Sequence, residues 1–161
     1  MNEETEKKGV ENNIRKFMKD RDLDVFECIW SLLAYNLCFV SIIKEKDKLR
    51  DFVEKLDSIG QFMFNMIMNL CLYSNFTEEC GKEKSKKLTK KYINKQNITC
   101  MDFIIYLLII SHDLINYFIS LVNESEFKCY IDKSYKTIWL GQSVIDAALF
   151  GKEEKKDDKE R

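Results

Sequence analysis

The sequence contains no proline, only five glycines and a single histidine among its 161 residues. Proline and glycine are the residues that most often interrupt helices and form tight turns, so their scarcity favours long helices over turn-rich β-structures. So few glycines leave no phosphate-cradling glycine loop, and one histidine cannot supply the repeated Glu-x-x-His motif of di-iron bundles. We therefore predict an all-α fold.

The sequence also lacks an excess of positive or negative charge. The 26 Lys and Arg residues balance 27 Asp and Glu residues, which gives a formal net charge of −1 and argues against a nucleic-acid-binding protein. Apolar residues make up 45% of the chain, enough for a hydrophobic core. We expect a single helical domain over residues 1–151, followed by a disordered charged tail over residues 152–161.

Apolar residues recur at helical spacing in most of the chain. Two capping-box patterns, Asp24 with Glu27 and Thr99 with Asp102, mark helix starts. A Lys-rich connector with one short helix is expected over residues 75–98. The periodicity predicts about five helices, at residues 9–20, 25–46, 48–74 and 100–122 and from Tyr135 to a C-cap at Gly151.

The segment 100–122 is the most apolar, and we expect it to be the buried apolar central helix of the bundle. Such a bundle is similar in architecture to Bcl-2-like folds and to four-helix bundles. The N-W-G-R signature of Bcl-2-like proteins is absent from the chain, so the analogy stays at the level of the fold and assigns no residue a role.

Catalytic and metal-binding patterns are missing. Ser111, His112 and Asp113 are adjacent, but neighbouring residues on a helix point about 100° apart, so they do not form a relay within one helix. The six cysteines include no C-x2-C pair of the kind that binds zinc. We expect a non-enzymatic protein with no catalytic residue, metal site or cofactor.

An uncharged amide stripe lies on the predicted helix 48–74. Gln61, Asn65 and Asn69 follow one another at four-residue steps, and Met66 and Met68 add soft apolar surface of the kind found in adaptable helix-binding grooves. These five residues are the candidate partner-binding set. Core filling is the more common use of methionines at such positions.

Lysines between residues 82 and 95 form the strongest local charge, with seven Lys against three Glu from Glu78 to Lys95. This excess could contact an acidic protein, a phosphate or an anionic lipid, or simply face solvent. Arginine is absent there and Tyr92 is the one interleaved aromatic residue, which is poor material for binding nucleic acid. The candidate anion-contacting residues are Lys84, Lys86, Lys87, Lys90 and Lys91.

The apolar faces are wider than a monomer of this size can enclose. We therefore expect a regulatory protein that binds a partner helix or forms a homodimer. A carrier of a lipid or other apolar ligand is an alternative. Membrane insertion is not expected, because the apolar runs carry amides, hydroxyls or flanking acids.

The compartment is predicted from the termini and cysteines. The acidic N-terminus is no signal peptide, and three of six cysteines lie in apolar helical stretches, which favours a reduced, intracellular and cytoplasmic protein. The even cysteine number and three N-glycosylation sequons support the alternative of a secreted, disulfide-bonded helical factor, with Cys80, Cys100 and Cys129 as the favoured participants in disulfides. Abundant Lys and Asn with few Arg hint at an AT-rich genome.

Overall fold

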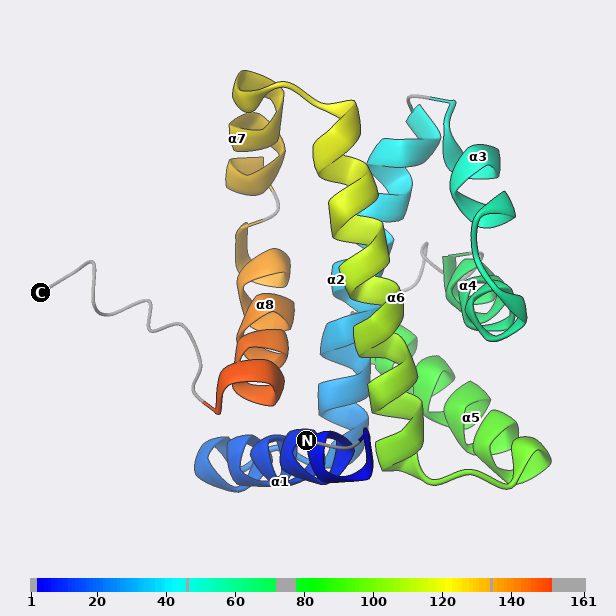
Figure 1. The fold of residues 1–161 in the computed structure, drawn as a ribbon, viewed down its shortest axis with the longest axis vertical. Coiled ribbons are helices and arrows are strands. Elements are labelled where there is room, and N and C mark those ends of the chain that lie inside the picture. The colour runs from blue at the N-terminus through cyan, green and yellow to red at the C-terminus, as the bar shows by residue number, and fades with distance from the viewer. Residues whose placement is uncertain (1–2, 46, 72–77, 134, 152–161) are drawn as a thin grey trace, which may run out of the picture.

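The computed structural model describes residues 3–45, 47–71, 78–133 and 135–151. Over these ranges the chain forms helices and no strands, so the predicted all-α bundle is confirmed (Figure 1). The eight helices are α1 (Glu3–Arg21), α2 (Val25–Glu45), α3 (Leu49–Glu54), α4 (Ser58–Cys71), α5 (Glu78–Gln96), α6 (Cys100–Leu121), α7 (Glu124–Lys133) and α8 (Tyr135–Phe150).

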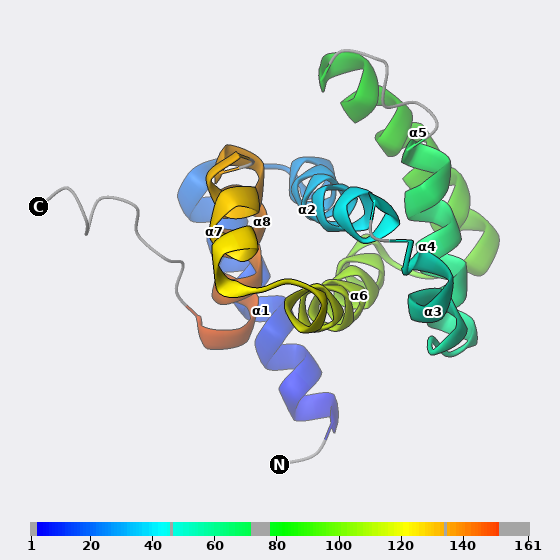
Figure 2. The ribbon, with the colours of Figure 1, turned by 90° about the horizontal axis from the view of Figure 1, so that it is seen from above.

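A buried apolar helix lies at the centre of the bundle, and it is α2. This helix contacts α3, α4, α5, α6 and α8, and Figure 2 shows it between α8 on one side and α4 and α5 on the other. In α2, 61% of the most apolar stretch is buried, whereas in α6 only 39% of the corresponding stretch is buried. The assignment of residues 100–122 as the central helix was wrong, because composition alone does not show how many neighbours cover a helix.

The core joins α2 to α6 through aromatic rings that pack edge-to-face or tilted against one another. The ring centroids of Tyr35 and Phe39 lie 4.9 Å apart, and Phe39 lies 4.9 Å from Phe118 of α6. Aromatic pairs at these distances add roughly 0.5–1.5 kcal/mol beyond the burial of their area. Other fully buried core side chains are Ile14, Ile29, Leu32, Leu33, Ile43, Met63, Phe103 and Ile104.

Both predicted capping boxes are confirmed. The Glu27 N–H donates to the Asp24 carboxylate at 2.9 Å, and the Asp24 N–H donates back to Glu27 at 3.2 Å. At the start of α6, the Asp102 N–H donates to the Thr99 hydroxyl at 3.0 Å, and the Thr99 N–H donates to the Asp102 carboxylate at 3.1 Å. These bonds satisfy N–H groups that would otherwise lack partners, so local residues determine where α2 and α6 begin.

Helix ends form largely without glycine. Asp22, Asp47 and Asn97 follow α1, α2 and α5 and adopt left-handed backbone conformations with φ of 54°, 59° and 54°. After each one the next N–H bonds five residues back, as from Leu23 to the Met18 carbonyl at 2.9 Å, which is the Schellman arrangement. Gly151 has φ +73° at the end of α8, where a C-cap was predicted.

The predicted helix 48–74 is two helices in the structure. Asp57 interrupts it, because its carboxylate accepts a hydrogen bond from the Gly60 N–H at 2.7 Å and so caps the start of α4. Apolar periodicity continues through the break, which is why the pattern alone suggested one element.

The predicted Lys-rich connector is mostly the helix α5. Ser85 and Thr89 are buried, and Leu88, Tyr92 and Ile93 pack against the core at the matching helical spacing. Small polar residues thus occupy two of these five inward positions, and an interpretation based on apolar residues alone misses them.

Two further helices differ from the prediction. No helix was predicted between residues 122 and 135, but Asn123 accepts a hydrogen bond from the Glu126 N–H at 2.9 Å and starts α7. Helix α1 extends from Glu3 to Arg21, beyond the predicted 9–20, because nothing in the charged first turns breaks it. The predicted tail over residues 152–161 lies outside the described residues.

Helix α8 packs closely on α2 at Gly141. A Cβ atom placed on Gly141 would lie 2.5 Å from the Cβ of Tyr35, which is 1% exposed. Gly141 is therefore required for this contact, and the close approach compensates for the poor helix propensity of glycine.

Candidate functional site: an apolar groove between α6 and α8

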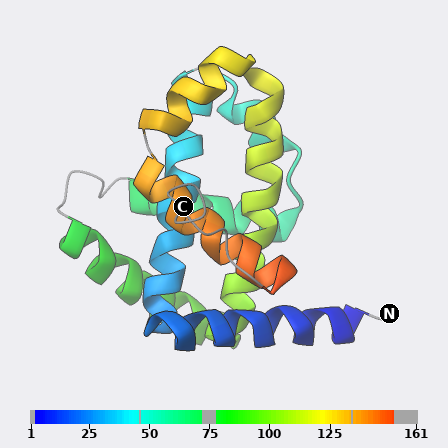
Figure 3. The same cartoon turned by 90° about the vertical axis from the view of Figure 1, so that its left-hand side faces the viewer.

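Four helices surround a groove with a volume of about 600 Å³. Figure 1 shows α8 beside α6 with α2 behind them, and Figure 3 shows α1 running across the lower end of both helices. The volume of the groove is within the range of about 300–1,000 Å³ that is usual for ligand sites. The lining residues are Val10 of α1, Tyr35 of α2, Ile105, Leu108, Ile109, Ser111, His112 and Ile115 of α6, and Gln142, Ile145, Asp146, Leu149 and Phe150 of α8.

Helical spacing directs large apolar side chains into the groove from both walls. Ile105 and Ile109 are four residues apart on α6, and Ile145 and Leu149 are four residues apart on α8, so each pair lies on one face of its helix. Ile109 is 56% exposed, Leu149 53% and Phe150 70%. Three large apolar side chains are therefore more than half exposed around this one groove.

Helix α1 is anchored across one end of the groove. The Lys7 ammonium lies 2.9 Å from the Asp102 carboxylate of α6, and the Asn13 amide donates to the Ala148 carbonyl of α8 at 3.0 Å. The hydrogen bond from Lys7 lowers the pKa of Asp102, and the same bond raises the pKa of Lys7. These contacts tie α1 to both walls.

A chain of hydrogen bonds leads from the groove floor to a single carboxylate. The Tyr35 hydroxyl donates to the Gln142 side-chain oxygen at 3.0 Å, and the Gln142 amide donates to Asp146 at 3.0 Å. Burial first, and then the negative charge of Asp146, raise the pKa of Tyr35 well above its usual range, so Tyr35 remains a donor. Asp146 is half-buried and is the one acidic residue among the residues lining the groove.

The sole histidine takes part in no catalytic relay within the described residues. His112 is exposed, and its Nε2 lies 3.1 Å from the Asn116 amide nitrogen. Ser111 is buried and accepts a hydrogen bond from the Asn36 amide at 2.8 Å. This polar pair joins α2 to α6 below the groove.

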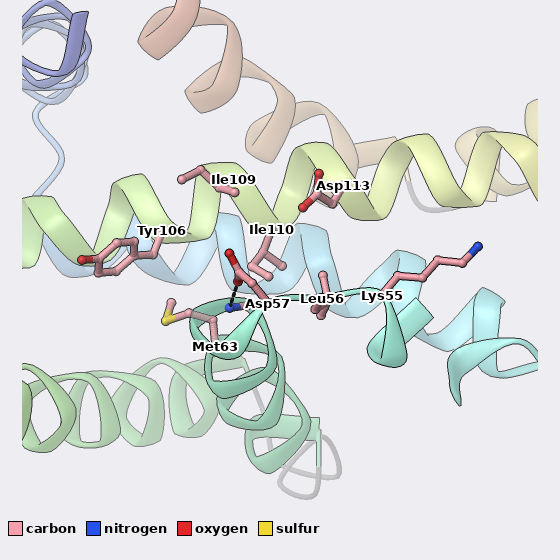
Figure 4. Close-up of a pocket in the computed structure, with 9 residues that line it drawn as sticks. Lys55, Leu56, Asp57, Met63, Tyr106, Ile109, Ile110 and Asp113 are labelled. Atoms are coloured by element: carbon pink, nitrogen blue, oxygen red, sulfur yellow. Dashed lines mark hydrogen bonds between the residues drawn. The ribbon is translucent and has the colours of Figure 1, made fainter. Parts of the chain in front are cut away.

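A smaller cleft of about 280 Å³ lies on the other side of α6, against the junction of α3 and α4 (Figure 4). Lys55, Asp57, Tyr106 and Asp113 supply its polar groups. Asp57 already accepts the Gly60 N–H, and no group of three potential metal-ligating side chains occurs in the part of the chain that the structure describes.

The candidate partner-binding residues all lie on α4, away from the groove. Gln61 and Asn65 are exposed, and the Gln61 amide donates to the Leu56 carbonyl at 3.2 Å. Met68 is half-buried and packs against the core. The side chains of Met66 and Asn69 lie outside the described residues. The role of this stripe in binding remains a prediction.

The candidate anion-contacting lysines lie on α5, where they do not line the groove. Lys84, Lys87, Lys90 and Lys91 are exposed and Lys86 is half-buried. The ammonium groups of Lys86 and Lys90 lie 5.3 and 5.4 Å from the ring centroid of Phe26 of α2. Cation–π contacts of this kind hold two lysines against the bundle, so they contribute to packing as well as to surface charge.

Two helices, α2 and α6, are long and apolar enough by composition to cross a membrane, a test that core helices of soluble proteins also pass.

Among the described cysteines, Cys100 is half-buried, Cys129 is exposed, and neither forms a disulfide. Burial raises the pKa of the Cys28 thiol to about 12, which keeps it protonated at neutral pH.

Sequence reasoning missed the groove because its residues come from four helices whose pairing no local pattern reveals. The available signal was the surplus of apolar residues at the end of α8, where Leu149 and Phe150 precede a stretch of charge. The chain matches no family model, no curated protein and no solved structure.

Proposed function

We propose that this protein is a non-enzymatic regulator that binds an amphipathic helix of a partner protein in the groove between α6 and α8. The observation that carries the proposal is the grouping of Ile109, Leu149 and Phe150, each more than half exposed, around one apolar groove. Amphipathic helices bind such grooves through apolar residues at positions i, i+3, i+4 and i+7.

The length of the groove favours a helix as its ligand. The α6 wall runs from Ile105 to Ile115, which corresponds to roughly 15 Å along the helix axis. A ligand helix with apolar residues at i to i+7 needs about 10 Å of wall. Each Leu, Ile or Phe side chain that becomes fully buried contributes about 1.5–3 kcal/mol before the costs of association. Three such side chains would together contribute about 4.5–9 kcal/mol before those costs.

Other occupants fit less well. The charged segment 152–161 contains no apolar residue, so it offers nothing to bury in the groove. A lipid carrier usually encloses its ligand, whereas here the apolar side chains at the rim are more than half exposed. Binding would act by sequestration, because a partner helix held in the groove is withdrawn from other contacts. We place this activity inside the cell, in line with the sequence.

The test is a selection from a displayed library of helix-forming peptides of about 18 residues, randomised at the apolar-face positions. We expect recovered peptides to bind the parent protein and to lose binding to the Ile109→Glu variant, since a charge at the rim opposes apolar burial. Ile119→Glu is the matched control, because Ile119 is 51% exposed on the same helix but does not line the groove. Equal binding to both variants would contradict the proposal.

Native mass spectrometry of the same samples separates the other occupants. A monomer free of small molecules agrees with a partner helix. A dimer that Ile109→Glu dissociates would identify a second copy as the occupant, and a retained apolar compound lost in the same variant would identify a carrier. Gln61→Lys with Asn65→Lys tests the α4 stripe: weaker peptide binding in this double variant would move the site to α4.

A further inference from the structure

We infer that the partner helix carries a lysine or arginine on its otherwise apolar face, placed to meet Asp146. This inference rests on the proposed function, because it concerns the ligand of the same groove. It specifies the chemistry of the partner: an amphipathic helix with one basic residue among its apolar positions.

Asp146 has a fixed position in the groove wall. It is half-buried on α8, and its Oδ1 accepts a hydrogen bond from the Gln142 amide, which in turn accepts one from the Tyr35 hydroxyl. Tyr35, where this series of hydrogen bonds begins, is 1% exposed and is packed closely against Gly141. A carboxylate held in this way presents its charge without losing further side-chain freedom when a ligand binds.

The carboxylate has no positive partner within the described residues. No lysine or arginine lines the groove, and no ion pair to Asp146 is formed there. His112 lies on the opposite wall, where its Nε2 lies 3.1 Å from the side-chain nitrogen of Asn116 rather than beside Asp146. The lining thus carries one uncompensated negative charge.

Covering the groove with a purely apolar helix would remove water from Asp146 without replacing its solvation, which is costly. A basic residue on the ligand compensates for that loss, and the attraction is stronger in the drier environment of the complex. The groove therefore selects among amphipathic helices by charge as well as by shape.

The peptide selection described above tests this inference by comparing three proteins. Peptides recovered with the parent protein should be enriched in Lys or Arg at one apolar-face position. Asp146→Asn should remove the enrichment, and Asp146→Lys should replace it by Glu or Asp. Asn at position 146 still accepts the Gln142 hydrogen bond, so this variant changes the charge and keeps the local geometry. Asp113→Asn, which removes an exposed carboxylate outside the groove, is the control and should leave the enrichment unchanged.

A binding cycle makes the result quantitative. Replacing the basic residue of one recovered peptide by Gln should weaken its binding to the parent protein by about tenfold, and should leave its binding to Asp146→Asn nearly unchanged. Two outcomes would overturn this inference and leave the proposed function standing. The first is that peptides whose binding depends on Ile109 show no enrichment in Lys or Arg. The second is that replacing the basic residue of the peptide by Gln weakens binding to the parent protein and to Asp146→Asn equally. Failure to recover any peptide that depends on Ile109 would instead overturn the proposed function.

Discussion

Replacing Gly141 by alanine tests the packing that holds one groove wall in place. A Cβ at position 141 would lie 2.5–2.7 Å from the Cβ, Cγ and Cδ2 atoms of Tyr35. Real Cβ atoms essentially never approach other atoms to within 3.0 Å. Tyr35 has no room to retreat, since it is buried and its ring packs against Phe39.

The expected magnitude follows from two opposing effects. Overpacking a core costs about 1–3 kcal/mol, and the contact with an atom so close to the α2 backbone places this case near the upper end. Alanine recovers about 1 kcal/mol of helix propensity relative to glycine. We therefore expect Gly141→Ala to lower the free energy of unfolding by about 2 kcal/mol.

Urea unfolding followed by circular dichroism measures this change, with Gly9→Ala as the control. Gly9 is exposed in α1, and a Cβ atom added there would meet no atom within 4 Å, so the same substitution should raise stability by up to about 1 kcal/mol. Changes of opposite sign in the free energy of unfolding of the two variants would support the packing of α8 on α2. An equal stabilisation by both would refute it.

Three further predictions concern stability, and urea unfolding measures each of them. Asn97→Gly should stabilise by up to about 1 kcal/mol and Asn97→Val should destabilise by about 1–2 kcal/mol, because Asn97 has φ 54°; equal effects would contradict the left-handed cap. Asp57→Ala should cost about 1 kcal/mol through loss of the hydrogen bond from the Gly60 N–H, and no loss would remove the reason for the break between α3 and α4. The raised pKa of Cys28 predicts stability that is fully present below the usual thiol pKa of about 9 and is lost as pH rises towards 12. Between pH 7 and 10 the parent should therefore lose roughly 1 kcal/mol more than Cys28→Ala, and identical pH profiles would contradict the burial of this thiol.

Local signals in the sequence predicted local structure well. The capping boxes at Asp24 and Thr99 and the C-cap at Gly151 lie where they were expected, because each depends on residues close together in the chain. The same chemistry at Asp57 and Asn123 was overlooked, since an apolar pattern continued through the first and a polar segment surrounded the second.

Features that depend on packing between segments far apart in the sequence were harder to predict. The apolar content of α2 and α6 is nearly the same, and only their packing shows that α2 is central while α6 leaves Ile109 and Ile119 exposed. The groove depends on the close approach of α8 to α2 at Gly141, for which the sequence offered an unexplained helical glycine. A surplus of apolar surface was predictable from composition, but its location was not.

The most direct test of the groove as a binding surface is a methyl NMR spectrum of the isoleucine-labelled protein, recorded with and without a selected helical peptide. If the partner helix binds between α6 and α8, the largest shift changes will occur at Ile105, Ile109 and Ile145, and Ile119 will be unaffected. Changes at Ile119 that equal those at Ile109, or changes confined to residues of α4 or α5, would contradict it.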